Sequence, residues 1–401
     1  MFRHICGKID EVEVNMTVFN RDLISPEKSF FLFGPRATGK STWLKNELAP
    51  DYSIDLLKSR EYLRFSKYPE ELSELILANP KWTKIVIDEI QKVPELLDEV
   101  HSIIFEHKNR MQFVLTGSSA RKLKKSGTNF LAGRALLRKF YPLNAFELGK
   151  HFELNLAIRF GLLPEVWNLK NESEKNDYLY SYVETYLREE IQQEALTRNL
   201  PAYSKFLEHM ALRNSHVINL QNLSNEIGVA RTTLKGYLEI LEDTLLGSSL
   251  NPIHLKAKVK EVSTPKFYFF DPGVVRGLTN SLNEKLDARE KGSQLETYIL
   301  HELKCFSDYY GKMWQFFYWS TPSMTEVDFI VSQGKEKIGI EVKSAKNWDL
   351  DFNYGLNILL DEKKISKAYG IYDGEEIIKK GKVMVIPAKI FSSYMRDHNL
   401  F

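Results

Sequence analysis

The residue pattern with the clearest chemistry lies between positions 30 and 42. The apolar run 30–33 is followed by a loop with two glycines and then by a Lys-Ser-Thr sequence of helical character. The glycines let backbone N–H groups converge on an anion, and the helix N-terminus adds partial positive charge. In such loops the lysine reaches the β- and γ-phosphates and the next hydroxyl binds Mg²⁺. The pattern predicts a site for ATP and Mg²⁺ built from Gly34, Pro35, Arg36, Ala37, Thr38, Gly39, Lys40, Ser41 and Thr42.

Two adjacent acids supply the other half of such a site. Asp88 and Glu89 follow the apolar, β-branched run 85–87, which is typical of a buried parallel strand. At the end of that strand, Asp88 would hold Mg²⁺ through water, and Glu89 would activate the attacking water as a general base. The alternative is a strand that ends in ordinary surface acids.

A third apolar run, 112–115, ends in hydroxyl residues. Thr116 and Ser118 are the candidates for a hydrogen bond to the γ-phosphate or to the attacking water. The alternative is a turn that uses small polar residues.

Arginines follow this strand. Arg134 lies in the sequence Phe-Leu-Ala-Gly-Arg-Ala, and an arginine near the γ-phosphate neutralises charge in the transition state. We expect Arg134 to act in this way, from the same chain or from a neighbouring copy. Arg121 and Arg138 are alternatives, and a solvated surface position would also explain each of the three.

A second set of charged residues lies near the C-terminus. Glu341 and Lys343 are two positions apart and therefore share one face of a strand, and Asp328 begins the neighbouring strand. These two strands would form a hairpin across 332–336, and Glu296 would add a carboxylate from an upstream helix. We predict that Glu296, Asp328 and Glu341 hold Mg²⁺ or Mn²⁺ and that Lys343 positions or activates water, which is the layout of PD-(D/E)xK nucleases. A nuclease-like fold without cleavage activity is the alternative.

The elements that must position these residues alternate between strand and helix over 30–140. This alternation predicts a parallel α/β sheet, with strands near 30–33, 52–55, 84–88, 112–116 and 137–141. Residues 178–191 have apolar and aromatic side chains at helical spacing, so that 142–212 is predicted to be a helical lid. We expect a multidomain α/β chain with an ATPase core over 1–141, the lid over 142–212, a winged helix over 213–275 and the nuclease-like domain over 276–401.

The winged-helix prediction depends on two short helices, 219–228 and 231–242, followed by strand-like pieces at 245–250 and 266–270. Arg231, Thr232 and Lys235 would face a DNA major groove, and the basic stretch 254–260 would contact phosphates. Such domains also serve as packing or protein-binding modules, and this alternative stays open.

Composition constrains the whole chain less than these motifs do. The 401 residues suggest roughly two to four domains, and 43% hydrophobic residues can form their cores. The formal net charge of +2 favours no partner class. Cys6 and Cys305 have no metal-ligand spacing. Because the start lacks a signal-like apolar segment and no stretch has the roughly 20 apolar residues of a membrane span, we expect a cytoplasmic protein without a membrane partner.

The order of these motifs resembles the AAA+ branch of P-loop ATPases. From about residue 20 onward, the chain is similar to a prokaryotic family of AAA-type ATPases with a winged helix and a C-terminal nuclease-like domain of unknown function. The resemblance includes Leu163–Val166, Tyr186–Ile191 and Phe270–Gly273, besides the motifs above. It departs at Ala37, where a larger polar residue is usual, and at Glu189-Glu190, where an acid-aspartate pair is more familiar. The resemblance implies ATP binding and supplies no substrate.

Two hypotheses of function follow. The first is an ATP-regulated nuclease or DNA-processing enzyme, favoured by the complete set of Glu296, Asp328, Glu341 and Lys343. The second is a nucleotide-dependent switch that recruits protein partners, with an inert nuclease fold, favoured by the near-neutral net charge. Both hypotheses expect ATP as a partner; the first adds DNA, the second adds other proteins, and further copies of the chain fit either.

Overall fold

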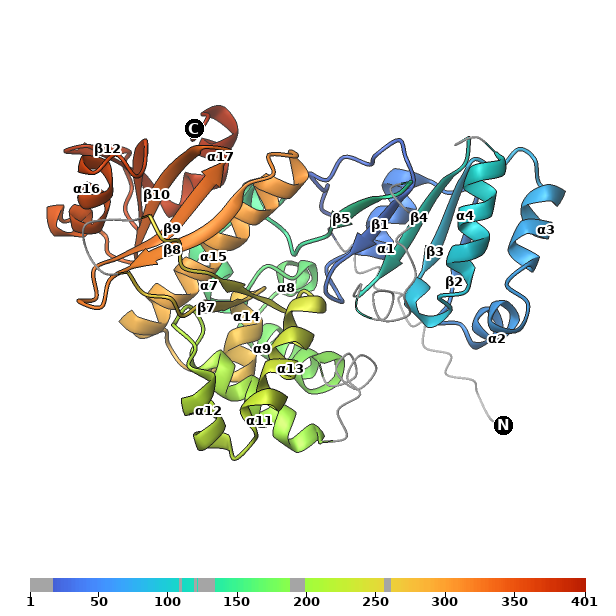
Figure 1. Ribbon diagram of the computed structural model, residues 1–401, viewed down its shortest axis with the longest axis horizontal. Helices are drawn as coiled ribbons and strands as arrows, with labels where there is room; N and C mark the ends of the chain where they lie inside the picture. Colours follow the sequence, from blue (N-terminus) through green and yellow to red (C-terminus); the bar gives the residue numbers. More distant parts are fainter. Residues whose placement is uncertain (1–16, 108–109, 119–120, 122–133, 188–198, 256–260) are drawn as a thin grey trace, which may run out of the picture.

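The computed structural model describes residues 17–107, 110–118, 121, 134–187, 199–255 and 261–401, with Tyr186 and Leu187 described by their backbone alone. Figure 1 shows three regions, which we name by residue range: the N-terminal region (17–141), the middle region (142–285) and the C-terminal region (286–401). The N-terminal and C-terminal regions lie at opposite ends of the long axis, and the middle region lies below and between them (Figure 1).

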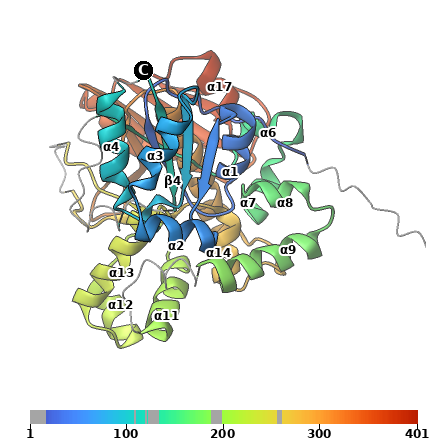
Figure 2. The same cartoon turned by 90° about the vertical axis from the view of Figure 1, so that its right-hand side faces the viewer.

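The N-terminal region is a five-stranded parallel sheet with strand order β2-β3-β4-β1-β5. The central strands β3, β4 and β1 are mostly apolar and buried, which suits a sheet covered on both faces, whereas the edge strands β2 and β5 carry more polar residues. Figure 2 shows α3 and α4 on one face and α1 on the other. The elements are β1 (Phe30–Phe33), α1 (Lys40–Trp43), η1 (Leu44–Leu48), β2 (Tyr52–Asp55), α2 (Ser59–Lys67), α3 (Glu71–Ala78), β3 (Lys84–Asp88), η2 (Ile90–Lys92), α4 (Leu96–Glu106), β4 (Gln112–Gly117) and β5 (Leu136–Lys139).

Alternation along β1 explains how the sheet is covered. Phe31 and Phe33 pack in a core with residues of α3 and α4, whereas Phe30 and Leu32 pack on the opposite side with Trp43 of α1. The predicted strands at 30–33, 52–55 and 84–88 have these bounds in the structure, and the other two differ by one or two residues at their ends.

The middle region is mostly helical, with a two-stranded antiparallel sheet of β6 and β7 before its last helix. One hydrophobic core runs through it from Phe160 to Leu282, so its early helices and its late helices and strands pack together. The helix predicted over 178–191 begins earlier and changes at Tyr182 into the π-helical η5; residues 188–191 lie outside the described residues. The elements are α6 (Ala145–Leu148), η4 (Gly149–His151), α7 (Leu154–Phe160), α8 (Pro164–Asn168), α9 (Glu172–Ser181), η5 (Tyr182–Leu187), α11 (Leu200–Ala211), α12 (Leu220–Ile227), α13 (Arg231–Asp243), β6 (Gly247–Leu250), β7 (Lys266–Phe269) and α14 (Pro272–Leu278).

The C-terminal region is a six-stranded mixed sheet with strand order β12-β13-β11-β10-β9-β8. Strands β8, β9 and β10 are antiparallel, and β11 returns parallel to β10 after α16. The predicted hairpin is present, and Gly334 at its turn has φ of 60°. The elements are α15 (Ala288–Tyr309), β8 (Gln315–Ser320), β9 (Glu326–Gln333), β10 (Glu336–Lys343), η6 (Leu350–Asn353), α16 (Tyr354–Asp361), β11 (Lys367–Tyr372), β12 (Ile378–Lys380), β13 (Val383–Pro387), η7 (Ala388–Ile390) and α17 (Phe391–Asp397).

Helix α15 packs one face of this sheet in a core shared with α17, and α16 packs the other face. Among the described residues, no helix is both long and apolar enough to cross a membrane.

Candidate functional site

The phosphate-binding loop begins where β1 ends. A Cβ at Gly34 would lie 2.2 Å from the carbonyl oxygen of Phe140, so only glycine fits between the loop and the residue after β5. Gly39 caps α1 with φ of 92°, a left-handed conformation that favours glycine. The Lys40 ammonium, which is buried, donates to the carbonyl oxygens of Gly34 (2.6 Å) and Pro35 (2.9 Å). It therefore lies over the loop that the sequence assigns to phosphates.

The middle of the loop is bonded to other segments. The Thr38 hydroxyl donates to the Pro35 carbonyl (2.9 Å), which stiffens the loop from within. The Arg21 guanidinium donates to the Thr38 carbonyl (2.7 Å), and the Tyr182 hydroxyl donates to the Arg36 carbonyl (3.2 Å). The loop is thus in direct contact with the segment before β1 and with the middle region.

Three of the predicted site residues, Ser41, Asp88 and Thr116, meet beside the loop, near the carboxyl ends of β3 and β4. The Ser41 hydroxyl lies 3.4 Å from one carboxylate oxygen of Asp88, and the Thr116 hydroxyl donates to the other. Asp55, at the end of β2, pairs in register with Asp88 and lines a hollow of about 480 Å³ with it and Ser41. Hydroxyl and carboxylate oxygens are the ligands that Mg²⁺ takes beside phosphates, so these residues fit a magnesium nucleotide.

Glu89 is buried and adopts a left-handed backbone conformation, with φ of 60°. Its carboxylate accepts a hydrogen bond from the Gln91 amide (2.6 Å), which also lies 3.4 Å from the Ser118 hydroxyl. A Cβ at Gly117 would lie 2.2 Å from the Gln91 amide oxygen, so the strand end and the amide fit closely. Sequence reasoning assigned no role to Gln91; the available signal was a polar residue two positions after the acid pair.

The arginines do not converge on this site within one chain. Arg134 lies two residues before β5 and contacts His101 and the ring of Phe105 on α4. Because β5 is parallel to β1, Arg134 lies at the amino edge of the sheet, opposite the phosphate-binding loop. Arg121 pairs with Asp243 at the end of α13 (3.0 Å), and Arg138 donates to the carbonyl of Leu137.

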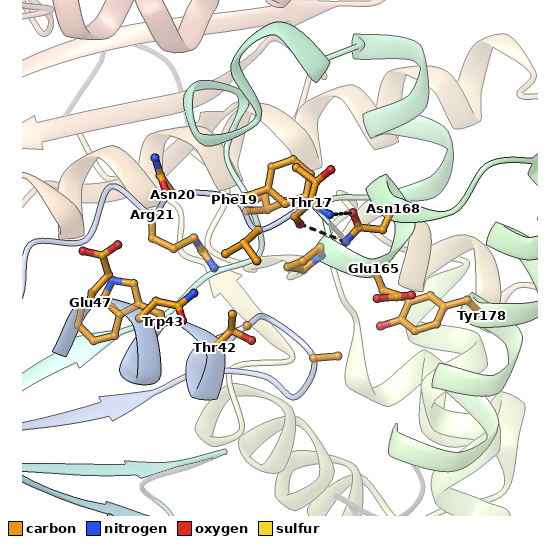
Figure 3. A pocket seen from close by; sticks show the side chains of 16 residues that line it. Thr17, Phe19, Asn20, Arg21, Thr42, Trp43, Glu47, Glu165, Asn168 and Tyr178 are labelled. Atoms are coloured by element: carbon orange, nitrogen blue, oxygen red, sulfur yellow. Dashed lines mark hydrogen bonds between the residues drawn. The ribbon is translucent and has the colours of Figure 1, made fainter. Parts of the chain in front are cut away.

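A cavity of about 650 Å³ adjoins the loop (Figure 3). One wall is the loop and α1, a second is the segment before β1, and a third is α8 and α9 of the middle region. The lining residues include Thr17, Phe19, Arg21, Ala37, Gly39, Thr42, Trp43, Glu47, Pro164, Glu165, Asn168 and Tyr178. The sequence predicted no role for the segment before β1, because its residues have no motif of their own.

Arg21 fixes this segment in place. Its side chain is 4% exposed, pairs with Glu147 of α6 (3.0 Å) and stacks on the Phe140 ring (4.1 Å to the centroid). Thr17 is held in turn by its backbone N–H, which donates to the Asn168 side chain (2.9 Å). The wall of the cavity is therefore built by contacts between distant parts of the chain.

The structure also brings together the four residues predicted for the C-terminal site. The Lys343 ammonium pairs with Glu341 and lies 4.0 Å from Asp328, and Asp328 accepts a hydrogen bond from the backbone N–H of Val342 (2.8 Å). Glu296 accepts a hydrogen bond from the Tyr268 hydroxyl (2.9 Å). Burial and the neighbouring Asp328 together raise the pKa of Glu296 to about 8, against the opposing effect of Lys266.

Two residues without a predicted role complete this cluster. Lys266 of β7 pairs with Glu326 of β9, and its ammonium lies 3.9 Å from Asp328 and 4.0 Å from Glu296. In the described part of the chain, no three His, Cys, Asp or Glu side chains are grouped so as to hold a metal ion. The residues as arranged do not fit the predicted Mg²⁺ or Mn²⁺, because ammonium groups already neutralise these carboxylates.

The middle region presents the residues predicted to contact DNA. Arg231, Thr232 and Lys235 are exposed on α13, while Leu234 and Tyr237 of the same helix are buried. Of the predicted basic stretch 254–260, residues 256–260 lie outside the described residues. Its flanks are held along β8, where the Ile253 N–H donates to the Tyr318 carbonyl (2.8 Å) and the Val262 N–H to the Ser320 carbonyl (2.9 Å).

Comparison with known proteins gives each region a match. Residues 26–149 match a family described as an AAA domain, residues 151–285 a domain of unknown function (DUF8612), and residues 291–391 another (DUF4143). An uncharacterized protein of Mycobacterium tuberculosis is 24% identical over 365 residues, which cover 89% of this chain and 79% of that protein. An uncharacterized protein of Methanocaldococcus jannaschii is 26% identical over 330 residues, covering 73% of this chain and 71% of the other.

The AAA match covers the parallel sheet, the phosphate-binding loop and the acid pair. Residues 26–149 are therefore similar to an AAA domain, a domain type of nucleotide-binding ATPases, and the two regions that follow match families whose descriptions name no function.

Proposed function

We propose that the chain binds ATP with Mg²⁺ and hydrolyses it. The observation that carries this proposal is the meeting of Lys40, Ser41, Asp88 and Thr116 beside one loop, next to a cavity large enough for a nucleoside. The loop N–H groups and Lys40 would bind the β- and γ-phosphates. The cavity of about 650 Å³ would bind the base and ribose. Gly39 and Thr42 belong to the predicted phosphate site and also line this cavity, so a nucleotide with its phosphates in the loop would place its nucleoside there.

Each side chain has a distinct role in this proposal. Bound Mg²⁺ would neutralise charge that develops on the phosphates, held by the Ser41 hydroxyl and by Asp88 through water. Glu89 would orient water and accept its proton as the water oxygen bonds to the γ-phosphorus and the bond to the ADP oxygen breaks. Thr116, bonded to Asp88, would keep that carboxylate in place.

ATP binding and hydrolysis can be tested separately with two variants. Lys40→Ala should weaken ATP binding by about ten-fold or more, because a buried cation that meets the phosphates is lost. Glu89→Gln should bind ATP normally and hydrolyse it about a hundred times more slowly, because binding does not need the base. Calorimetry with ATP and a phosphate-release assay measure the two effects; wild-type binding and turnover in Lys40→Ala would refute the proposal.

We further propose that ATP controls how the three regions are arranged, as a nucleotide-dependent switch. The supporting contacts are the hydrogen bonds that the loop carbonyls of Arg36 and Thr38 accept from Tyr182 and Arg21. A phosphate drawn into the loop would alter the positions of these carbonyls and so bias the middle region. Hydrogen exchange at η5 and α8, with and without ATP, tests this role; exchange that ATP leaves unchanged would contradict it.

DNA processing is the second candidate, favoured by the exposed side chains of Arg231, Thr232 and Lys235 on α13. In this hypothesis α13 is the recognition helix of a winged helix, and the nuclease-like domain acts nearby. The test uses plasmid and single-stranded DNA with Mg²⁺ or Mn²⁺, with and without ATP, and compares the wild type with Lys343→Ala. Cleavage that the variant abolishes would establish a nuclease, and no cleavage under any condition would favour the switch.

A further inference from the structure

The segment that joins β6 to β7 is docked on the C-terminal sheet. Its first part runs beside β8: the Tyr318 N–H donates to the Asn251 carbonyl (3.1 Å), and the Ile253 N–H donates to the Tyr318 carbonyl (2.8 Å). Its last part is bonded as well, since the Tyr318 hydroxyl donates to the Thr264 carbonyl and the Trp319 indole N–H to Glu261 (2.9 Å). These contacts fix the position at which β7 begins, and its first residue is Lys266.

Lys266 sends its ammonium into the carboxylate cluster of the C-terminal region. Its side chain is 5% exposed, and three carboxylates surround the ammonium: Glu326 in an ion pair, Asp328 at 3.9 Å and Glu296 at 4.0 Å. The Tyr318 ring lies beneath it, 5.3 Å from ring centroid to nitrogen. Carboxylates this close to an amine favour its charged form. The lysine is therefore held in its charged form.

A divalent metal would need the oxygen atoms that Lys266 already neutralises. Mg²⁺ and Mn²⁺ bind carboxylates at about 2 Å and repel any other cation at that distance. Lys343 occupies the other side of the cluster, bonded to Glu341. A metal could enter only if the Lys266 ammonium left the space between Asp328 and Glu296.

We propose that Lys266 is the resident cation of this cluster and keeps it closed to divalent metals. The strand β7, positioned by the docked segment, supplies a positive charge from the middle region to the C-terminal region. The cluster then joins the two regions instead of binding metal, and it gains a metal site only when Lys266 is removed. This inference does not depend on ATP hydrolysis.

The test measures Mn²⁺ binding by the paramagnetic resonance of free Mn²⁺, without nucleotide, in full-length protein. Every sample carries Asp88→Asn, so that the N-terminal region contributes no binding. The chain with Lys266 should bind no Mn²⁺ tighter than millimolar, whereas Lys266→Gln should bind one Mn²⁺ at least about ten-fold more tightly. Adding Asp328→Asn to Lys266→Gln should remove that binding.

Lys304→Gln is the matched control. Lys304 of α15 also bonds across to the middle region, at the Ser248 hydroxyl, but contacts none of the three carboxylates. It should therefore show no gain in Mn²⁺ binding. A Lys266→Gln protein that folds and gains no metal would overturn the proposal.

If Lys266→Gln does not fold, Mn²⁺ binding by the protein that retains Lys266 still tests the proposal. One Mn²⁺ bound tightly by that protein and lost with Asp328→Asn would show that the lysine does not close the cluster. The absence of such binding, together with an unfolded Lys266→Gln, would support the role of Lys266 as the cation that the buried carboxylates require.

Discussion

At the scale of single residues, Gln91 links the acid pair to the hydroxyl residues of the neighbouring strand. Its amide donates to Glu89 (2.6 Å) and lies near Ser118, while its oxygen packs against Gly117. Gln91 is not among the residues that we assign to phosphate or Mg²⁺, and its shorter hydrogen bond is to Glu89, so we infer that it acts by positioning Glu89. Its environment is buried, where a fixed hydrogen bond orients a carboxylate most effectively.

We predict that Gln91→Ala lowers kcat for ATP by about ten-fold and leaves KM nearly unchanged. The reason is that Glu89 loses its orienting donor, whereas the loop that binds phosphate is untouched. Steady-state kinetics measures both constants, and Glu89→Gln serves as the reference for complete loss of the base. Equal kcat in wild type and Gln91→Ala would show that the amide does not position Glu89.

A second residue-scale prediction concerns pH. Burial, with smaller contributions from Arg21 and Lys304, lowers the pKa of His301 to about 3, against the opposing effect of a hydrogen bond with the Leu143 carbonyl. The folded protein therefore keeps His301 neutral, while the unfolded chain takes up a proton below about pH 6.5. The stabilisation is complete above pH 6.5 and is lost as the pH falls towards 3.

Urea unfolding of wild type and His301→Gln at pH 7.5 and pH 5 tests this. The wild-type advantage over the variant should shrink by about 2 kcal/mol at the lower pH, because a pKa difference of one unit is worth about 1.4 kcal/mol. The comparison cancels the other buried acids, such as Glu302, which both proteins share. A difference that stays constant with pH would contradict the lowered pKa.

Residues with a local sequence signature were predictable, and residues that depend on distant partners were not. The backbone geometry of the loop 34–42 requires particular residue types at fixed positions, and this pattern can be recognised in the sequence alone. Arg21 and Lys266 acquire their roles only because Thr38, in one case, and Asp328, in the other, lie beside them in the fold. A lone basic residue carries no such information in sequence.

At the scale of elements, apolar runs and alternation predicted the parallel strands and the β9–β10 hairpin, because burial on one face or both sets those patterns. The docking of the β6–β7 segment on β8 was not predictable. Its backbone hydrogen bonds to Tyr318 and Ser320 require no particular side chain, so no residue pattern in the sequence indicates them.

The junction of β1 with β5 gives an element-scale prediction. At Gly34, a Cβ would lie 2.2 Å from the Phe140 carbonyl oxygen, and backbone cannot move aside as a flexible side chain can. Gly34→Ala should therefore lower the free energy of unfolding by about 3 kcal/mol and weaken ATP binding, since strand and loop must separate.

Gly236→Ala is the matched control for this prediction. Gly236 lies inside α13 with open space around its Cα, so alanine should raise stability by up to about 1 kcal/mol. Thermal and urea unfolding of both variants give the comparison. Equal stability of Gly34→Ala and wild type would mean that the strand junction relaxes freely.

At the scale of the whole molecule, Arg134 lies on the edge of the N-terminal sheet opposite the phosphate-binding loop. It therefore cannot complete the site of its own chain in this arrangement. If it serves catalysis, it must reach the site of a neighbouring copy through a head-to-tail contact.

We predict that Arg134→Ala lowers ATP hydrolysis by about a hundred-fold or more with little change in ATP binding, and that Arg138→Ala does not. Mixing Arg134→Ala with Lys40→Ala should restore about a quarter of the wild-type rate, because one contact in four then joins an intact site to an intact arginine. The rate should fall on dilution as copies separate. Full activity of Arg134→Ala would assign the arginine to packing against His101 and Phe105, and an inactive mixture, despite subunit exchange, would exclude its action between copies.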